Sequence, residues 1–171
     1  MKELLAGKVE NQPHFEFEDN LSENLKKIEA ITEFYNENFP KSKNSVDFKV
    51  RKYANRELQP IVLTISESGK IVGLLESWLV EDDLQTRILV TLAVDEKYRG
   101  KGLAKKLLSK AFQATSKEDD FTWVLHFRDS KKQQLASFYA AAGFGDLVDV
   151  GNYKNGETKW EMTRKQINKK D

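Results

Sequence analysis

The stretch from residue 86 to residue 112 constrains the fold more than any other part of the chain. Residues 86–94 are dense in Ile, Leu and Val, which predicts a strand buried on both faces of a sheet. A loop with Gly100 and Gly102 follows and opens directly into a helical pattern that begins at Leu103. The first N–H groups of a helix have no helical partner and lie at the positive end of its dipole. The junction is therefore a candidate site for an anion such as a phosphate.

The remaining periodicities alternate between strands and helices. Strands are predicted at 14–18, 61–65, 71–80, 86–94, 123–127, 147–150 and 158–162, and helices at 25–35, 102–112 and 131–142. Residues 46–58 are ambiguous, and we interpret them as a second short helix. Turn residues separate the strands between 61 and 94, which predicts an antiparallel meander. The fold class is mixed α+β.

Length and composition exclude several kinds of protein. A chain of 171 residues predicts one domain over 1–171, with flexible termini at 1–13 and 165–171. The net charge of +1 gives no overall attraction for nucleic acid or an anionic membrane, and no apolar run reaches the length of a membrane span. We interpret the basic residues between 97 and 110 as a solvated face. The absence of cysteine and the presence of only two histidines argue against a metal site. We expect a cytoplasmic protein, with a homodimer as an open alternative.

Two motifs together resemble the GNAT superfamily of acyl-CoA-dependent N-acyltransferases. Arg99-x-x-Gly102-x-Ala104 follows the 86–94 strand and is similar to the superfamily's acyl-CoA-binding pattern, R/Q-x-x-G-x-G/A. The run LASFYAAAGF at 135–144 looks like its later helix, which carries a tyrosine four residues before Gly-Phe. The resemblance covers residues 60 to 150. It implies a GNAT-like, mostly antiparallel sheet flanked by helices, with a splayed cofactor cleft between the fourth and fifth strands.

The resemblance also implies a cosubstrate, acetyl-CoA, and an amine of a small molecule or peptide as the acceptor. By position, the expected cofactor-binding residues are Leu92, Ala93, Val94, Arg99, Gly100, Lys101, Gly102, Leu103 and Ala104. The side chain of Arg99 or Lys101 is expected to touch a phosphate oxygen. Two positions depart from the superfamily's pattern. Glu96 replaces a common proline, and Lys132, which either meets a phosphate or faces solvent, replaces the asparagine that often begins the later helix.

Attack of an amine on a thioester requires two proton transfers. Tyr139, similar in position to the tyrosine that protonates the leaving sulfur in many members, is the expected acid, with simple core packing as the alternative. The strand 87–94 carries no carboxylate, so Glu76 is the expected base, because apolar surroundings can make a glutamate more basic. A solvent-facing Glu76 and proton removal through water are the alternatives. We interpret His126 as a hydrogen-bonded strand histidine, with a side chain that points into the cleft as the alternative.

These residues predict an N-acetyltransferase that acts by direct attack of a primary amine. The alternative is a GNAT-fold module that binds acyl-CoA without turnover, as a sensor or a partner-binding protein. The loss of the strand carboxylate and of the helix asparagine keeps this alternative open. We expect the acceptor to be selected by the first helical segment and the connections around residues 36–58, by the turn at 81–83 and by the final strands, where the resemblance is weakest.

Overall fold

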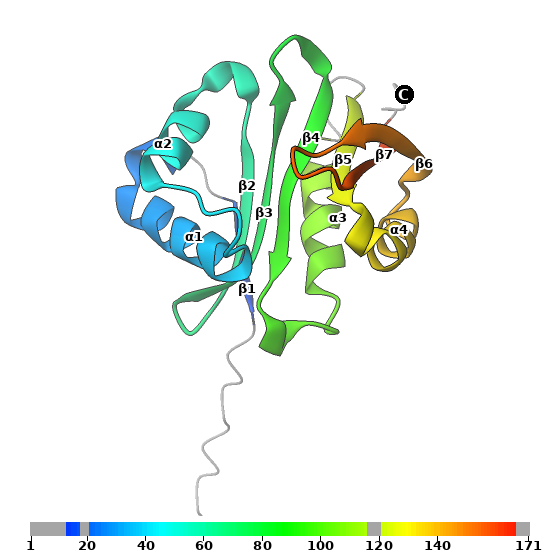
Figure 1. Cartoon of the computed structure of the whole chain (residues 1–171). Coiled ribbons are helices and arrows are strands. Elements are labelled where there is room, and N and C mark those ends of the chain that lie inside the picture. The colour runs from blue at the N-terminus through cyan, green and yellow to red at the C-terminus, as the bar shows by residue number, and fades with distance from the viewer. Residues whose placement is uncertain (1–12, 18–20, 116–120, 167–171) are drawn as a thin grey trace, which may run out of the picture.

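Seven strands and four α-helices make up the part of the chain that the computed structural model describes, which is residues 13–17, 21–115 and 121–166 (Figure 1). The strands are β1 (His14–Phe17), β2 (Ile61–Glu67), β3 (Lys70–Val80), β4 (Asp83–Val94), β5 (Phe121–Arg128), β6 (Gly145–Asn152) and β7 (Thr158–Gln166). The helices are α1 (Leu25–Asn38), α2 (Val46–Ala54), α3 (Leu103–Thr115) and α4 (Lys132–Ala140).

The strands form one sheet in the order β1-β2-β3-β4-β5-β7-β6. Neighbouring strands are antiparallel throughout, except that β4 and β5 run parallel. Helix α3 lies between these two in the chain, and parallel neighbours need a crossover of this kind. The predicted α+β class, with its meander of β2, β3 and β4, is confirmed.

Two layers of helices cover the two faces of the sheet. Figure 1 shows α1 and α2 on one face, and α3 and α4 on the other. Each face has its own buried cluster, one around Ile28 and Ile31 of α1 and one around Leu107 of α3 and Trp123 of β5. Strand β3 lies between the layers and is buried without interruption from residue 72 to residue 77. This explains its continuous apolar pattern.

The ambiguous segment and the first two residues of the expected tail belong to regular elements. The hydroxyl of Ser45 accepts a hydrogen bond from the Phe48 amide (3.1 Å) and begins α2, which confirms the helix interpretation. Lys165 and Gln166, which we placed in the tail because they are polar, belong to β7 and pair with β5. Their backbone continues an existing ladder, and a strand on a sheet does not require apolar side chains at its end. Residues 1–12 and 167–171 of the expected termini lie outside the described residues.

The packing of α3 gives a first prediction. Leu107 has no exposed surface, whereas Leu25 on α1 is 54% exposed. Leu107→Ala should lower the free energy of unfolding by about 2–5 kcal/mol, because it leaves a cavity that the sheet cannot close. Leu25→Ala, the same chemical change at an exposed helix position, should change it by about 0.5 kcal/mol or less. Urea denaturation measures both, and equal losses would contradict the proposed core.

Candidate active site

The two parallel strands in the middle of the sheet, β4 and β5, separate partway along their length. β4 and β5 are paired only from Thr86 and Thr122 to Leu89 and Leu125. Beyond these residues β4 stays paired with β3, and β5 stays paired with β7. The backbone edges that the two strands turn toward each other therefore lack ladder partners past Leu89 and Leu125. This is the expected splay between the fourth and fifth strands.

A β-bulge lies where the strands separate. Thr91 and Leu89 pair with the consecutive residues Glu76 and Ser77 of β3, so Val90 is the extra residue of β4. The hydroxyls of Ser77 and Thr91 are buried beside it and have no hydrogen-bond partner among the described residues. Buried hydroxyls are normally paired. The bulge thus combines an irregular ladder with unpaired polar groups, which is typical of a functional site.

A cavity of 560 Å³ opens beside the splay on the α3 and α4 face, and it brings together the two motifs. Its lining residues are Leu92, Val94, Tyr98, Arg99, Gly100, Gly102, Leu103, Ala104, Lys105, Gln134, Leu135, Phe138 and Tyr139. Seven of the nine expected cofactor-binding residues are among them. The other two are Ala93, which packs in the cluster with α1, and Lys101, whose ammonium lies over the Tyr98 ring at 4.9 Å.

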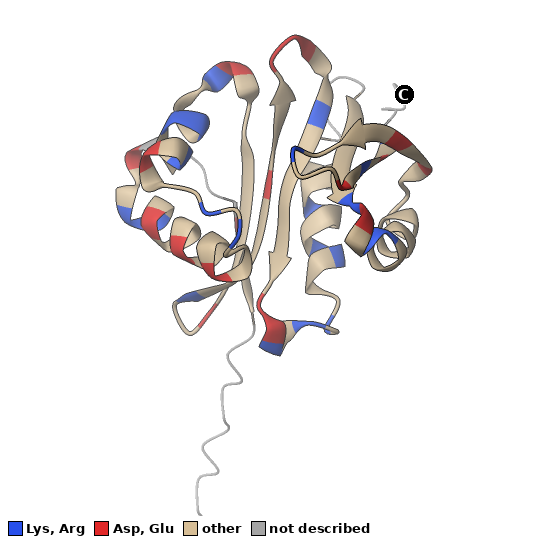
Figure 2. Ribbon diagram, viewed as in Figure 1, with Lys and Arg blue, Asp and Glu red and all other residues tan. Residues whose placement is uncertain are grey.

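The loop between β4 and α3 combines two glycines with positive φ and a side-chain hydrogen bond to the end of β4. Gly100 and Gly102 have φ of +77° and +75°, a region that glycine adopts without strain, and nothing lies within 4 Å of a Cβ built on either. The Arg99 side chain donates from Nε to the carbonyl of Val94 at 3.0 Å and ties the loop to the end of β4. The sequence pattern suggested a phosphate contact for this side chain and did not reveal this tie. Figure 2 shows basic positions along this loop and α3.

Tyr139 projects from α4 into the same cavity as the loop. Its ring is stacked with Phe127 of β5 and meets Phe138 and Phe144 edge to face. Burial raises the pKa of Tyr139 to about 12, so the phenol is neutral at physiological pH. No residue in the described ranges hydrogen-bonds its hydroxyl. The ring is packed in the core, as the packing alternative predicts. The hydroxyl is left as a free donor at the cavity.

Lys132, which replaces the asparagine that often begins the later helix, makes a contact that the sequence analysis did not predict. Its ammonium lies 3.3 Å from the centre of the Trp160 ring, a cation–π contact. The indole of Trp160 in turn donates to Asp129 at 2.8 Å. Lys132 therefore fastens the start of α4 to β7. The aromatic partner lies 28 residues away in the chain and gave no signal in the sequence.

A second, smaller cavity of 130 Å³ lies on the opposite face of the sheet, between α2, β3 and the bulge. Its lining residues are Tyr35, Asn44, Phe48, Lys49, Lys52, Tyr53, Glu76, Trp78 and Val90. Three of them are tyrosine or tryptophan, and two charged side chains, Lys49 and Glu76, are 2% and 1% exposed. The cavity is thus an aromatic pocket with a buried ion pair.

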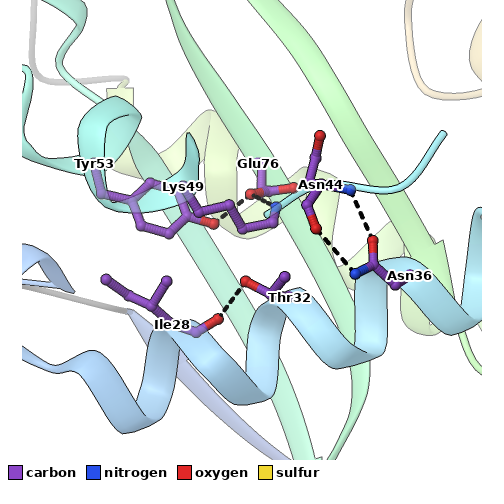
Figure 3. A network of polar contacts seen from close by, with 7 residues as sticks. All are labelled: Ile28, Thr32, Asn36, Asn44, Lys49, Tyr53 and Glu76. Carbon is purple, nitrogen blue, oxygen red and sulfur yellow. Dashed lines mark hydrogen bonds and ion pairs between the residues drawn. The ribbon is translucent and has the colours of Figure 1, made fainter. Parts of the chain in front are cut away.

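Glu76 forms the centre of this pocket (Figure 3). Lys49 donates to its Oε1 at 2.5 Å, and the Tyr53 hydroxyl donates to the same oxygen. Burial lowers the pKa of Lys49, and the carboxylate opposes that shift. The solvent-facing alternative for Glu76 is wrong, because α2 covers this part of β3. Lys49 and Tyr53 were missed by the sequence analysis, although their spacing of four residues on one helix face was visible.

His126 has a hydrogen-bond partner, as expected for a hydrogen-bonded strand histidine. Its Nε2 lies 2.8 Å from Oε2 of Glu161, directly across from it in the β5–β7 ladder. Among the described residues, no group of three or more potential ligands is arranged to hold a metal ion. The helices of the described ranges include none that is long and apolar enough to cross a membrane.

Comparisons with known proteins agree with this geometry. The model of the acetyltransferase (GNAT) family matches residues 28–144. The ribosomal-protein-S18-alanine N-acetyltransferase of Escherichia coli has a TM-score of 0.70 at 18% identity, with 91% of this chain and 95% of that chain covered. An aminoglycoside 6'-N-acetyltransferase complexed with coenzyme A has a TM-score of 0.72 at 14% identity, with 92% and 99% covered. YncA of Salmonella typhimurium, solved with acetyl-CoA, has a TM-score of 0.71 at 19% identity, with 94% and 96% covered.

These structures are too distant in sequence to show more than a common fold, but the family match extends over more than half of the chain. The splayed strands, the glycine loop and the later tyrosine all lie within the matched residues. The chain therefore belongs to the acetyltransferase (GNAT) family, and it is an acyltransferase.

Proposed function

We propose that this protein transfers an acetyl group from acetyl-CoA to a primary amine of a small molecule or peptide by direct attack. The observation that supports this most is the single cleft of 560 Å³ that contains both the glycine loop and Tyr139. The cleft lies within the size range of pockets for small ligands and cofactors. One end of it offers a site for anions, and the other offers a neutral hydroxyl.

The residues of the cleft fit the two chemical parts of acetyl-CoA. The amides from Arg99 to Ala104 would hold the pyrophosphate, because the first turn of α3 has N–H groups without helical partners and the two glycines admit close approach. The backbone of Leu92, Ala93 and Val94 would bind the pantetheine arm, because β4 has no ladder partner on that edge past Leu89. Ala93 takes part through its backbone only, since its side chain packs on the other face.

Tyr139 is proposed as the group that assists departure of the sulfur. When bound, acetyl-CoA supplies a thioester carbonyl as the electrophile. The C–N bond forms, the nitrogen loses one proton, the C–S bond breaks and its electron pair leaves on sulfur. The pKa of Tyr139, about 12, is well above the reference thiol value of about 8.5, so the hydroxyl donates a hydrogen bond to sulfur more readily than a whole proton. A phenol that stays neutral is a donor at every physiological pH.

Glu76 is proposed as the carboxylate that helps to position the acceptor amine. The aromatic pocket borders the bulge on the face opposite to Tyr139, where an amine could approach without displacing the leaving group. Both donors to Glu76, the Lys49 ammonium and the Tyr53 hydroxyl, act on Oε1. A carboxylate already paired in this way is a weak candidate for the base, and it suits the positioning of the acceptor better.

Calorimetric titration with acetyl-CoA, followed by detection of released thiol over a panel of antibiotics, polyamines, amino acids and peptides, tests the proposed function. Binding with thiol release would support the enzyme. Binding with no release by any amine would favour the sensor alternative, and no binding would contradict both.

The loop predicts a loss of acetyl-CoA affinity that depends on charge. Gly102→Asp should abolish measurable binding, because it places a carboxylate at the anion site. Gly102→Asn, which has nearly the same shape and also tolerates positive φ, should retain more affinity. Gly69→Asp is the matched control, since Gly69 has φ of +78° and nothing within 4 Å, but lies in the β2–β3 turn. Calorimetry measures all three, and loss of binding in the control would contradict the assignment.

Tyr139→Phe should lower kcat by about 10²-fold, at the low end of general acid–base effects, and leave acetyl-CoA affinity unchanged. The variant keeps the buried ring and removes only the hydroxyl. Tyr153→Phe, which removes a phenol after β6, should behave as wild type. Steady-state kinetics and calorimetry provide the two readouts, and an unchanged kcat would reduce Tyr139 to a packing residue.

The buried ion pair predicts strong coupling between Lys49 and Glu76. Lys49→Met should lower the free energy of unfolding by about 3–5 kcal/mol, because it leaves a buried carboxylate without its partner. Adding Glu76→Leu should recover much of this loss. Lys52→Met on the same helix, whose partner Glu81 is 3.6 Å away and exposed, should cost less than about 1 kcal/mol. If losses in urea denaturation simply add in the double variant, the pair is not coupled.

A further inference from the structure

The place of His126 in the sheet sets it apart from an ordinary strand histidine. Leu125 is the last residue of β5 that pairs with β4, so His126 is the first residue past the point where the strands separate. Leu125 and Phe127 are buried in the cluster on the α3 and α4 face. Because strand side chains alternate, His126 points to the opposite face. That face of the splay is where the aromatic pocket also lies.

In the register of the β4–β5 ladder, the bulge residue Val90 follows the last paired residue of β4, as His126 follows the last paired residue of β5. Leu89 pairs with Leu125, so Val90 would be the neighbour of His126 if the ladder continued. Val90 lines the aromatic pocket and is 42% exposed. His126 thus lies at the edge of the acceptor side, and Tyr139 lies on the other face of the same splay. An amine that reaches the splay from the pocket side would meet the imidazole before the sulfur side of the cleft.

The hydrogen bond of His126 leaves one ring nitrogen available. A carboxylate only accepts hydrogen bonds, so the Nε2–H group of His126 donates to Oε2 of Glu161 at 2.8 Å. The neutral ring then carries its lone pair on Nδ1, and no residue of the described ranges hydrogen-bonds that atom. The side chains of His126 and Glu161 are 21% and 28% exposed, which lets a ligand reach them. Their direct opposition in the ladder fixes the orientation of the ring.

The charged groups considered next, all within the described ranges, do not provide a competing base. Arg128 of β5 and Lys159 of β7 flank the pair two residues farther along the ladder, and Arg128 is bound to Glu157 at 3.2 Å. Glu76 is engaged by Lys49 and Tyr53 on the far side of β4. Ile88 and Val90 are the residues that β4 presents here, and neither titrates.

We infer that His126 is the general base for the acceptor amine and that Glu161 is its positioning residue, an assignment that rests on the proposed function. Nδ1 takes the proton of the attacking nitrogen as the C–N bond forms. The C–S electron pair leaves on sulfur, and the thiolate, which accepts a hydrogen bond from the Tyr139 hydroxyl, takes a proton from solvent. The imidazolium returns its proton to solvent, so the protons balance. Glu161 holds the Nε2–H tautomer and stabilises the imidazolium. Imidazole suits this role, because it exchanges protons near neutral pH.

The experiment compares His126→Gln, Glu161→Gln and His14→Gln. His14 is the only other histidine of the chain and lies on β1, far from the splay in the sheet order. Thiol release is measured against pH with the amine that wild type uses best, and acetyl-CoA affinity is measured by calorimetry. His126→Gln should lower kcat by about 10²–10⁴-fold and abolish the acidic limb of the profile. Glu161→Gln should move that limb to lower pH, and His14→Gln should match wild type.

The tautomer of the His126 ring can be measured without acetyl-CoA or an acceptor, and this gives a second test. With two histidines in the chain, ¹⁵N NMR resolves the rings, and His14→Gln assigns them. The neutral His126 ring should carry its proton on Nε2 in wild type and lose that preference in Glu161→Gln. A proton on Nδ1 in wild type, or a rate and pH profile in His126→Gln within twofold of wild type, would overturn the assignment. A wild type that binds acetyl-CoA but releases no thiol would overturn the proposed function, and this assignment with it.

Discussion

The separation of β4 from β5 past Leu89 and Leu125 is the constraint on which the rest of the site depends. A buried backbone group without a partner costs about 1–3 kcal/mol, so two strands in one sheet would normally stay paired. Here each strand is secured on its other side, β4 by β3 and β5 by β7. The bulge at Val90 turns β4 away at the same point. The splay is therefore built into the sheet, and its unpaired edges are ready to bind an extended ligand.

The two faces of the splay are supported by different physical means. On the α3 and α4 face, aromatic packing around Tyr139 and the buried leucines of α3 hold the loop and the later helix together. On the other face, α2 is fastened to β3 by the ion pair of Lys49 and Glu76. A buried ion pair adds little net stability compared with apolar packing, but it tolerates few alternative arrangements. It suits a pocket wall whose polar groups must keep one geometry.

Local and long-range features differed in how well the sequence predicted them. The loop with Gly100 and Gly102 and the start of α3 are specified by adjacent residues, so strand, turn and helix could be predicted from the pattern and were found. The partners of Glu76 and Lys132 come from segments 27 and 28 residues away, and no spacing rule connects them. The same holds for Glu161 opposite His126, 35 residues apart. Such pairs depend on strand order and register, which the tertiary fold decides.

The register of β5 explains how one strand can serve both sides of the reaction. Phe127 stacks against Tyr139 on the proposed sulfur side, and His126, one residue earlier, points to the opposite face, the proposed acceptor side. Strand alternation thus places the proposed hydrogen-bond donor to sulfur, Tyr139, and the proposed base, His126, on opposite faces of the sheet. A register slip of one residue would turn the imidazole into the apolar cluster and Phe127 out of it. The antiparallel ladder from Phe121 to Arg128 with β7 prevents this slip, and it also supplies Glu161. Pairing with β7 is therefore as necessary to the proposed chemistry as the separation from β4.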